Sequence, residues 1–224
     1  MSRITDYSFL FDQMFGTKSN SGLVNNIKVS SLSSRSTQAQ LRAAGIDTNS
    51  AQYKAAIKEM TKHPGSMGMS TNVQAIKNIM NTYDKNGDEI DPHTGLTGVF
   101  VTEETAAKRR RILSIPEDSR EEIYKIVRNN FEKNNGMTSE SDTKKEIFTN
   151  LQRRTNKNDR LAASWTLSQY EQAYAKAFVS AAKKADPSWD YGKPIPKGAF
   201  DGMTRESIEA NMGNLSKKGL DLRV

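Results

Sequence analysis

Apolar side chains recur every three or four residues through most of the sequence from residue 37 onward. Two segments carry the clearest stripes, Tyr53, Ala56, Ile57 and Met60 in the first and Val73, Ile76, Met80 and Tyr83 in the second. This spacing places the apolar side chains on one face of an α-helix. With the short helical pattern "TQAQLRAAG" from residue 37, the two segments predict a unit of three helices.

The second half of the chain repeats the same spacing. It predicts helices over about 116–134 and 141–154, a long helix capped by "TLSQ" at 166–169, and a terminal helix that begins at "RESIEANMG". The long helix has the strongest amphipathic stripe, formed by Leu167, Tyr170, Tyr174, Phe178 and Ala181. This part of the protein is therefore expected to be helical as well.

One segment has the composition of a β-strand. Val99, Phe100 and Val101 form a β-branched and aromatic cluster, and "DEID" at 88–91 is a partner for it in a hairpin. The predicted fold is thus mainly α, a multi-helix orthogonal or elongated bundle with one small β-hairpin near residues 88–101.

The pattern divides the chain into three expected parts. Residues 1–36 form an N-terminal arm with a short apolar helix, in which Phe11, Met14 and Phe15 stand at i, i+3 and i+4. Residues 37–102 form a helical subdomain with an Asp-rich loop and the hairpin, and residues 103–224 form a second helical subdomain.

The second subdomain contains a long stretch without helical spacing at residues 186–204. Prolines and glycines interrupt it, and connections of this length are uncommon in compact domains unless they are functional or disordered. Trp189, Tyr191 and Phe200 in this stretch predict that it is packed.

Composition narrows the classes of function. Only 35% of the 224 residues are hydrophobic and the mean hydropathy is -0.72, which predicts a thin core or an elongated molecule. The absence of cysteine excludes disulfides, thiolate nucleophiles and cysteine-based zinc sites. The apolar runs are far shorter than the ~20 residues of a membrane helix, so no membrane span and no classical secretion signal are expected. The composition fits a cytoplasmic protein or one exported without a classical signal peptide.

Carboxylate and amide oxygens gather directly after the helix predicted to end near Tyr83, at Asp84, Asn86, Asp88 and Asp91. The first three occupy positions 1, 3 and 5 of an EF-hand calcium loop. However, Glu89 replaces the glycine of position 6, and Gly95 replaces the glutamate of position 12. The pattern therefore indicates either a calcium site completed from outside the loop or a turn built from residues that tolerate a left-handed backbone.

Other chemistry has weaker signals. Neither His63 nor His93 has a nucleophile beside it in a known pattern, and no phosphate-binding or dinucleotide motif occurs, so we expect no enzymatic activity. The formal charge of +7 and the basic clusters at 108–111 and 153–160 keep a weak nucleic-acid binder as an alternative. Basic and acidic side chains are mixed along the chain, which mainly indicates solubility.

The stretches "DYSFLFDQMFG" at 6–16 and "PKGAFDGMTRESIE" at 196–209 resemble an uncharacterised bacterial family from Firmicutes that has no assigned activity. The resemblance implies a bacterial origin and transfers no catalytic or binding residue. The leading hypothesis is a non-enzymatic helical binding or structural protein that has a protein partner or self-associates. Its candidate docking elements are the N-terminal apolar segment and the loop from Trp189 to Phe200.

Overall fold

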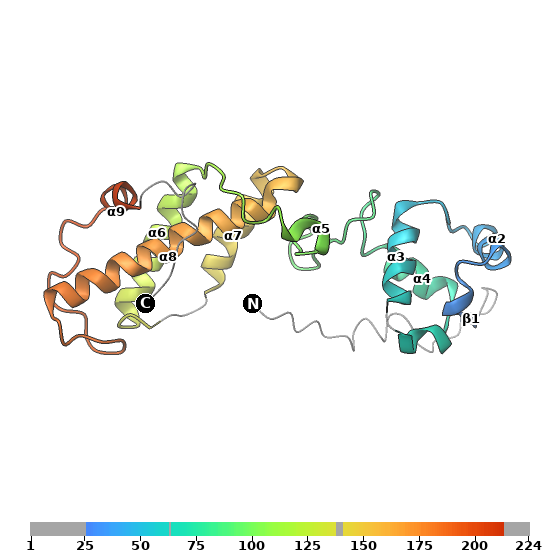
Figure 1. Cartoon of the computed structure of the whole chain (residues 1–224), viewed down its shortest axis with the longest axis horizontal. Coiled ribbons are helices and arrows are strands. Elements are labelled where there is room, and N and C mark those ends of the chain that lie inside the picture. The colour runs from blue at the N-terminus through green and yellow to red at the C-terminus, as the bar shows by residue number, and fades with distance from the viewer. Residues whose placement is uncertain (1–25, 63, 138–140, 213–224) are drawn as a thin grey trace. The chain divides into compact units, whose positions relative to one another are not determined.

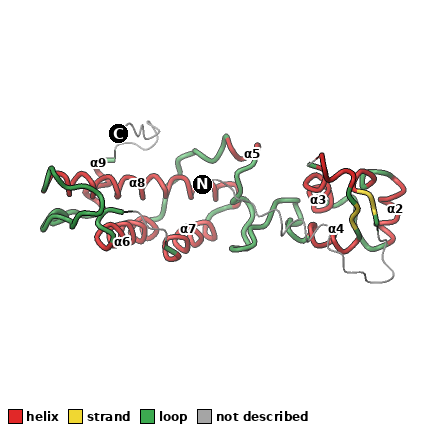
Figure 2. The backbone as a smooth tube through the Cα atoms, turned by 90° about the horizontal axis from the view of Figure 1, so that it is seen from below, coloured by secondary structure: helices red, strands yellow, loops and turns green. Residues whose placement is uncertain are grey.

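The computed structural model describes residues 26–62, 64–137 and 141–212 (Figure 1). The chain consists of two compact units, residues 1–97 and 98–224, and each is described by itself. Helices dominate both units, and one small two-stranded antiparallel sheet is present in the described part of the chain (Figure 2). The predicted mainly α fold with a small β element is confirmed. The apolar helix expected around Phe11 lies outside the described residues.

The described part of the first unit contains three α-helices, as the apolar stripes predict: α2 (Arg35–Ala43), α3 (Ala51–Thr61) and α4 (Val73–Met80). Each begins where the side chain of Ser34, Ser50 or Asn72 accepts a hydrogen bond from a backbone N–H three residues further on. Such caps satisfy donors that the first helical turn leaves free. The caps therefore fix where each helix starts.

The segment before α2 completes the core of this unit. Strand β1 (Ile27–Lys28) pairs antiparallel with β2 (Ser70–Thr71). The short 3₁₀ helix η1 (Val29–Ser31) follows β1, and η2 (Pro64–Gly68) precedes β2. Ile27, Val29 and Leu32 are buried against the three helices, and the Tyr53 hydroxyl donates to the Leu32 carbonyl at 2.9 Å. Residues 27–32, which we assigned to the N-terminal arm, thus belong to the packed unit.

The strand pair does not lie where the hairpin was expected, near residues 88–101. The chain does reverse there, but it forms only two isolated antiparallel bridges, Tyr83 with Glu89 and Ile90 with Thr97. Val99–Val101 follow the second bridge without joining a strand, and Val101 is exposed. The Asp-rich turns interrupt the strand pairing, because residues that form turns cannot also pair as regular strands.

The second unit is built around one long helix, α8 (Arg160–Ala185). The other elements among its described residues are α5 (Glu103–Ala106), α6 (Glu117–Lys133), α7 (Asp142–Arg154), η3 (Lys157–Asp159) and α9 (Arg205–Asn211). Helices α6, α7 and α9 all pack against α8. This helix begins six residues before the predicted cap at Thr166, whose hydroxyl instead donates to the Ala162 carbonyl inside the helix at 2.8 Å.

Aromatic side chains join the 186–204 loop to the core of the second unit. Trp189 is only 3% exposed and stacks on Phe131, with ring centroids 5.8 Å apart, while Phe200 packs against Phe178 at 5.0 Å. The prediction that this loop is packed is confirmed. Its role as a docking element is not supported by these two side chains, because both are buried core residues; Tyr191 alone of its aromatics is exposed.

None of the helices within the described ranges is both long enough and apolar enough to cross a membrane. Even α8, with 26 residues, carries charged side chains such as Glu171 and Lys176 among its apolar ones.

Candidate functional site

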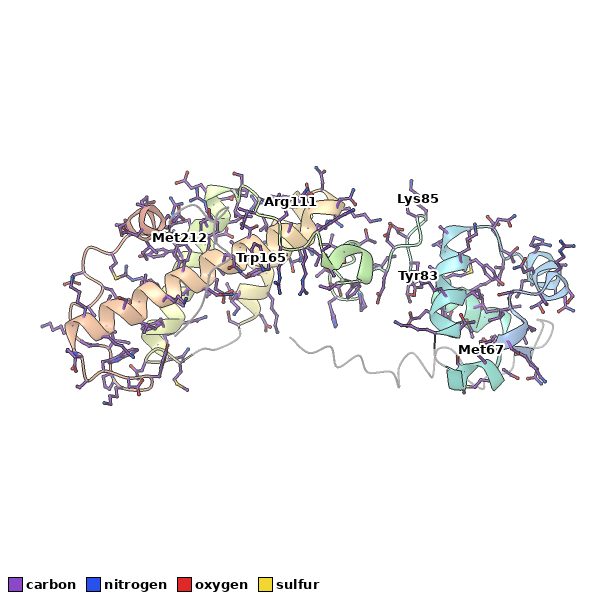
Figure 3. All side chains as sticks on the ribbon, in the orientation of Figure 1. Met67, Tyr83, Lys85, Arg111, Trp165 and Met212 are labelled. Carbon is purple, nitrogen blue, oxygen red and sulfur yellow. The ribbon has the colours of Figure 1, made fainter. Side chains whose placement is uncertain are left out.

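The residues predicted to bind calcium form two successive turns of the first unit. The carboxylate Oδ1 of Asp84 accepts hydrogen bonds from the backbone N–H groups of Asn86 at 2.9 Å and Asp88 at 3.0 Å. Gly87 between them has φ +81°, and a Cβ there would lie 2.9 Å from the Ala51 carbonyl oxygen, so this turn requires glycine. Lys85 lies at the tip of the turn (Figure 3).

The fourth predicted ligand, Asp91, starts the second turn. Its Oδ1 accepts from the backbone N–H of His93 at 3.1 Å, and its Oδ2 accepts from the Thr94 hydroxyl at 2.6 Å. Nowhere in the described ranges do three or more acidic or histidine side chains come together in a way that could hold a metal ion. Hydrogen bonds like those of Asp84 and Asp91 are typical of aspartates in turns, and the calcium site at Asp84, Asn86, Asp88 and Asp91 stays a prediction.

The two basic clusters meet within the second unit. Arg111 pairs with Asp159, and Arg154 pairs with Asp118 at 2.5 Å, where the hydrogen bond from Arg154 lowers the pKa of Asp118. Two of the predicted basic residues are therefore matched by carboxylates. His63 lies outside the described residues.

A groove with a volume of about 630 Å³ lies between α8 and α9 in the second unit. Its floor is formed by Ala173, Ala177, Ser180 and Ala181 of α8, and its other wall by Met203, Ser207, Ile208, Asn211 and Met212. The short side chains of α8 leave space beside α9, where Met212 lies (Figure 3). The lining is therefore mostly apolar.

Two lysines complete the lining of this groove. Lys176 and Lys184 stand on α8, both are exposed, and none of the described residues that line the groove is acidic. The nearby carboxylates of α9 belong to ion pairs, Glu206 with Arg205 and Glu209 with Arg120. The groove thus combines an apolar floor with positive charge.

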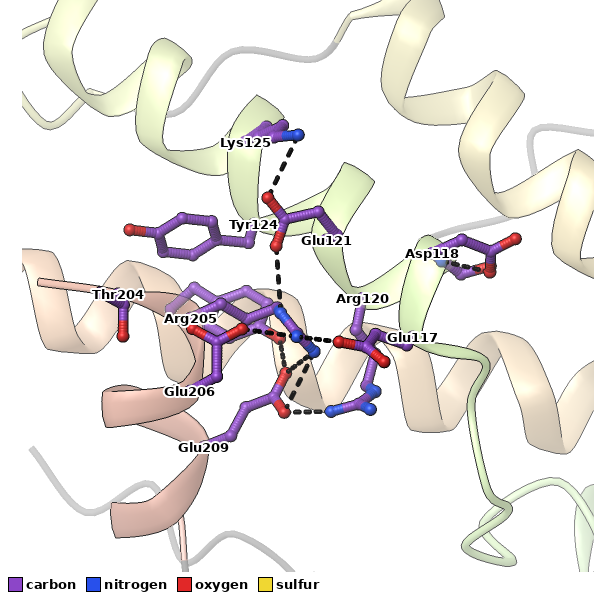
Figure 4. A network of polar contacts seen from close by, with 12 residues as sticks. Glu117, Asp118, Arg120, Glu121, Tyr124, Lys125, Thr204, Arg205, Glu206 and Glu209 are labelled. Atoms are coloured by element: carbon purple, nitrogen blue, oxygen red, sulfur yellow. Dashed lines mark hydrogen bonds and ion pairs between the residues drawn. The ribbon is translucent and has the colours of Figure 1, made fainter.

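An ion-pair network holds α9 in place on the side of α6 (Figure 4). At its centre Arg205 is only 5% exposed, and its Nη2 lies 2.6 Å from both Glu117 and Glu206. Its Nε lies 3.0 Å from Glu121 Oε2, which is close enough for an ion pair although the angle is not that of a hydrogen bond. Arg205 therefore ties the first residue of α9 to α6.

Glu209, one turn further along α9, makes the second connection. Its carboxylate accepts from Arg120 of α6 and from the Tyr174 hydroxyl of α8 at 2.5 Å. Arg120 also lies over the Tyr170 ring, 5.7 Å from its centroid. A single carboxylate thus joins three helices.

The electrostatics of the network agree with its geometry. Burial, and then the hydrogen bond to Glu209, raise the pKa of the Tyr174 hydroxyl well above its ordinary value. Burial alone would lower the pKa of Arg205, but the hydrogen bond to Glu206 and the surrounding carboxylates outweigh it and keep the guanidinium charged. Hydrogen bonds from its own backbone N–H and from the Arg205 side chain lower the pKa of Glu206.

One signal for this groove is present in the sequence, in the spacing of alanines on α8. Ala173, Ala177 and Ala181 recur at intervals of four on α8, which places short side chains along one face. Ala181 was read as part of the apolar core stripe, and it does pack partly against the core. The groove itself requires the position of α9, which depends on residues far away in sequence.

These features define a mainly helical protein with a groove held open between two helices. Residues 46–224 match the protein family described as a domain of unknown function, DUF3879. Because this match covers most of the chain, the protein belongs to that family, and the resemblance to an uncharacterised family is confirmed. Comparisons with curated proteins and with solved structures found no match.

Proposed function

We propose that this chain is a non-enzymatic binding protein, and that the groove between α8 and α9 holds an apolar helix that carries acidic side chains. The observation that carries this proposal is the combination of an apolar floor with Lys176 and Lys184 in one lining. Amphipathic helices commonly bind in grooves of this kind through apolar residues at i, i+3 and i+4.

The dimensions of the groove suit such a ligand. Its lining residues on α8 run from Ala173 to Lys184, about 16 Å along the helix axis. This length matches about three turns of a bound helix. Alanine and serine on the floor allow a second helix to approach α8 closely, while Met203 and Met212 adjust their shape to the side chains they meet. Apolar contact supplies the affinity in this arrangement.

The lysines supply selectivity. A pair of exposed opposite charges contributes only about 0.2–1 kcal/mol, so their main effect is to favour acidic partners over basic ones and to set the direction of docking. The network around Arg205 supports the proposal further. Because it fixes α9 before a partner arrives, little ordering of the groove is required on binding.

Fluorescence anisotropy of the full chain with a labelled synthetic helix tests this function. The probe has about 18 residues, or five turns, with leucines at i, i+3, i+4 and i+7 and glutamates elsewhere. We expect saturable binding with a Kd of about 10 μM or tighter. A second peptide, with lysines in place of the glutamates, is expected to bind at least about fivefold more weakly.

Two neighbouring lysines provide the variant and its matched control. Lys184 lines the groove and Lys183 does not, although both are exposed in the last turn of α8. Lys184→Glu is expected to weaken binding of the acidic peptide about three- to tenfold, whereas Lys183→Glu should change its Kd by less than about twofold. Equal effects of the two substitutions, or binding of neither peptide, would remove the groove as the docking site.

A further inference from the structure

We infer that the helix bound in this groove is residues 6–16 of a second copy of the chain, so that the protein self-associates. The inference rests on the proposed function and specifies its partner. Residues 6–16, "DYSFLFDQMFG", contain Asp6 and Asp12 and no basic side chain. They therefore have the two properties, apolar and acidic, that the groove selects.

The arrangement of these properties matches as well. On an α-helix over residues 6–16, which the apolar spacing predicts, successive side chains are turned by about 100°. Leu10, Phe11, Met14 and Phe15 then share one face. Asp6 borders this face on one side and Asp12 on the other. An apolar face with acidic borders is the complement of an apolar floor with lysines.

The charges also have compatible spacing along the helices. At about 1.5 Å per residue, Asp6 and Asp12 stand about 9 Å apart along the helix axis, and Lys176 and Lys184 stand about 12 Å apart. The lysine side chain is long and flexible enough to bridge this difference. The spacing of the acidic side chains along their helix is therefore comparable with the spacing of the groove lysines.

Another segment of the chain follows in sequence after a residue that lines the groove. Residues 213–224 follow directly after Met212, which lines it. Lys217, Lys218 and Arg223 make this segment predominantly basic. Because like charges disfavour docking next to Lys176 and Lys184, the acidic segment is the better occupant.

Docking of one copy's residues 6–16 into the groove of the next joins two different surfaces. Such head-to-tail contacts leave a free groove at one end and a free segment at the other unless a ring closes. We therefore expect the average mass of the protein to rise with concentration rather than to stop abruptly at a fixed small oligomer.

Sedimentation velocity of the full chain and of charge-reversal variants, at about 1 to 100 μM protein, tests this inference. The wild-type protein should associate over this range. Reversal of the groove charges in Lys176→Glu/Lys184→Glu should weaken association about tenfold, and so should Asp6→Lys/Asp12→Lys. Combining all four substitutions restores opposite charges and should recover most of the lost association. Lys183→Glu serves as the neutral control.

Three results would overturn the inference: a monomer at every concentration, association that ignores both charge reversals, or no recovery in the combined variant. A monomer that still binds the synthetic acidic helix would refute self-association while leaving the proposed function intact. A monomer that binds no acidic helix would refute both.

Discussion

Replacement of Glu209 by glutamine tests whether the ion-pair network holds α9 against the helices beside it. Glu209 receives hydrogen bonds from Arg120 and the Tyr174 hydroxyl and lies 3.4 Å from Arg205. Glutamine keeps the size and one acceptor oxygen, but it removes the charge that both guanidinium groups face. The groove loses its second wall if α9 separates from α8.

The burial of Glu209 and its partners determines how much stability the substitution removes. The side chains of Glu209 and Arg120 are only 15% and 22% exposed, and removal of one member of a buried ion pair costs about 3–5 kcal/mol. Because glutamine retains part of the hydrogen bonding, we expect a loss of about 2–4 kcal/mol in the free energy of unfolding of the second unit. With a slope of about 2 kcal/mol per molar urea, the midpoint falls by about 1–2 M.

Tryptophan fluorescence during urea unfolding measures this loss selectively. The sequence contains two tryptophans, Trp165 and Trp189, and both belong to the second unit. Glu206→Gln is the matched control, because Glu206 also pairs with Arg205 but its side chain is 67% exposed. The control should cost no more than about 1 kcal/mol. Equal losses for the two substitutions would refute the reasoning from burial.

Further predictions concern the two units separately. The pKa of Tyr174 is raised on folding, so its contribution to stability is present below pH 10 and is lost as the pH rises above it; Tyr174→Phe should reduce the alkaline slope of the unfolding free energy by up to about 1.4 kcal/mol per pH unit, measured by urea titrations. Gly136→Ala should destabilise the second unit by about 2–3 kcal/mol, because Gly136 has φ +82° and a Cβ there would lie 2.8 Å from Trp189. Gly192→Ala, with φ +83° and open space around it, should cost only about 1 kcal/mol in the same fluorescence assay. Millimolar calcium should leave the thermal unfolding of the first unit unchanged, because Asp84 and Asp91 already accept hydrogen bonds within their own turns; a rise in Tm that Asp88→Asn abolishes would contradict this expectation and support a calcium site.

Features that depend on local spacing were predictable from the sequence. Helix α6 spans Glu117–Lys133 where the apolar pattern predicts 116–134, and α7 spans Asp142–Arg154 where it predicts 141–154. Both helices bury a stripe at every third or fourth residue, which is the signal that periodicity detects. The start of α8 was missed, because a threonine inside a helix can bond to its own backbone and imitate a cap.

Features that depend on distant residues were not predictable in this way. The strand pair joins Ile27 to Thr71 through strands of two residues, which are too short to have a period. The groove exists because Arg205 reaches Glu117, 88 positions earlier in the chain. The Asp-rich loop is local in sequence, but its pattern is ambiguous. The same carboxylate and amide oxygens can bind a metal or stabilise a turn, so the sequence alone allows both interpretations.

Methionine methyl NMR of the full chain tests the groove most directly. Met203 and Met212 line it, whereas Met67 and Met137 are exposed elsewhere and serve as controls. On addition of the synthetic acidic helix, the account predicts saturable shifts of the Met203 and Met212 methyl signals and unchanged signals for both controls. Shifts confined to Met67 or Met137, or no shift at a peptide concentration that saturates anisotropy, would contradict it.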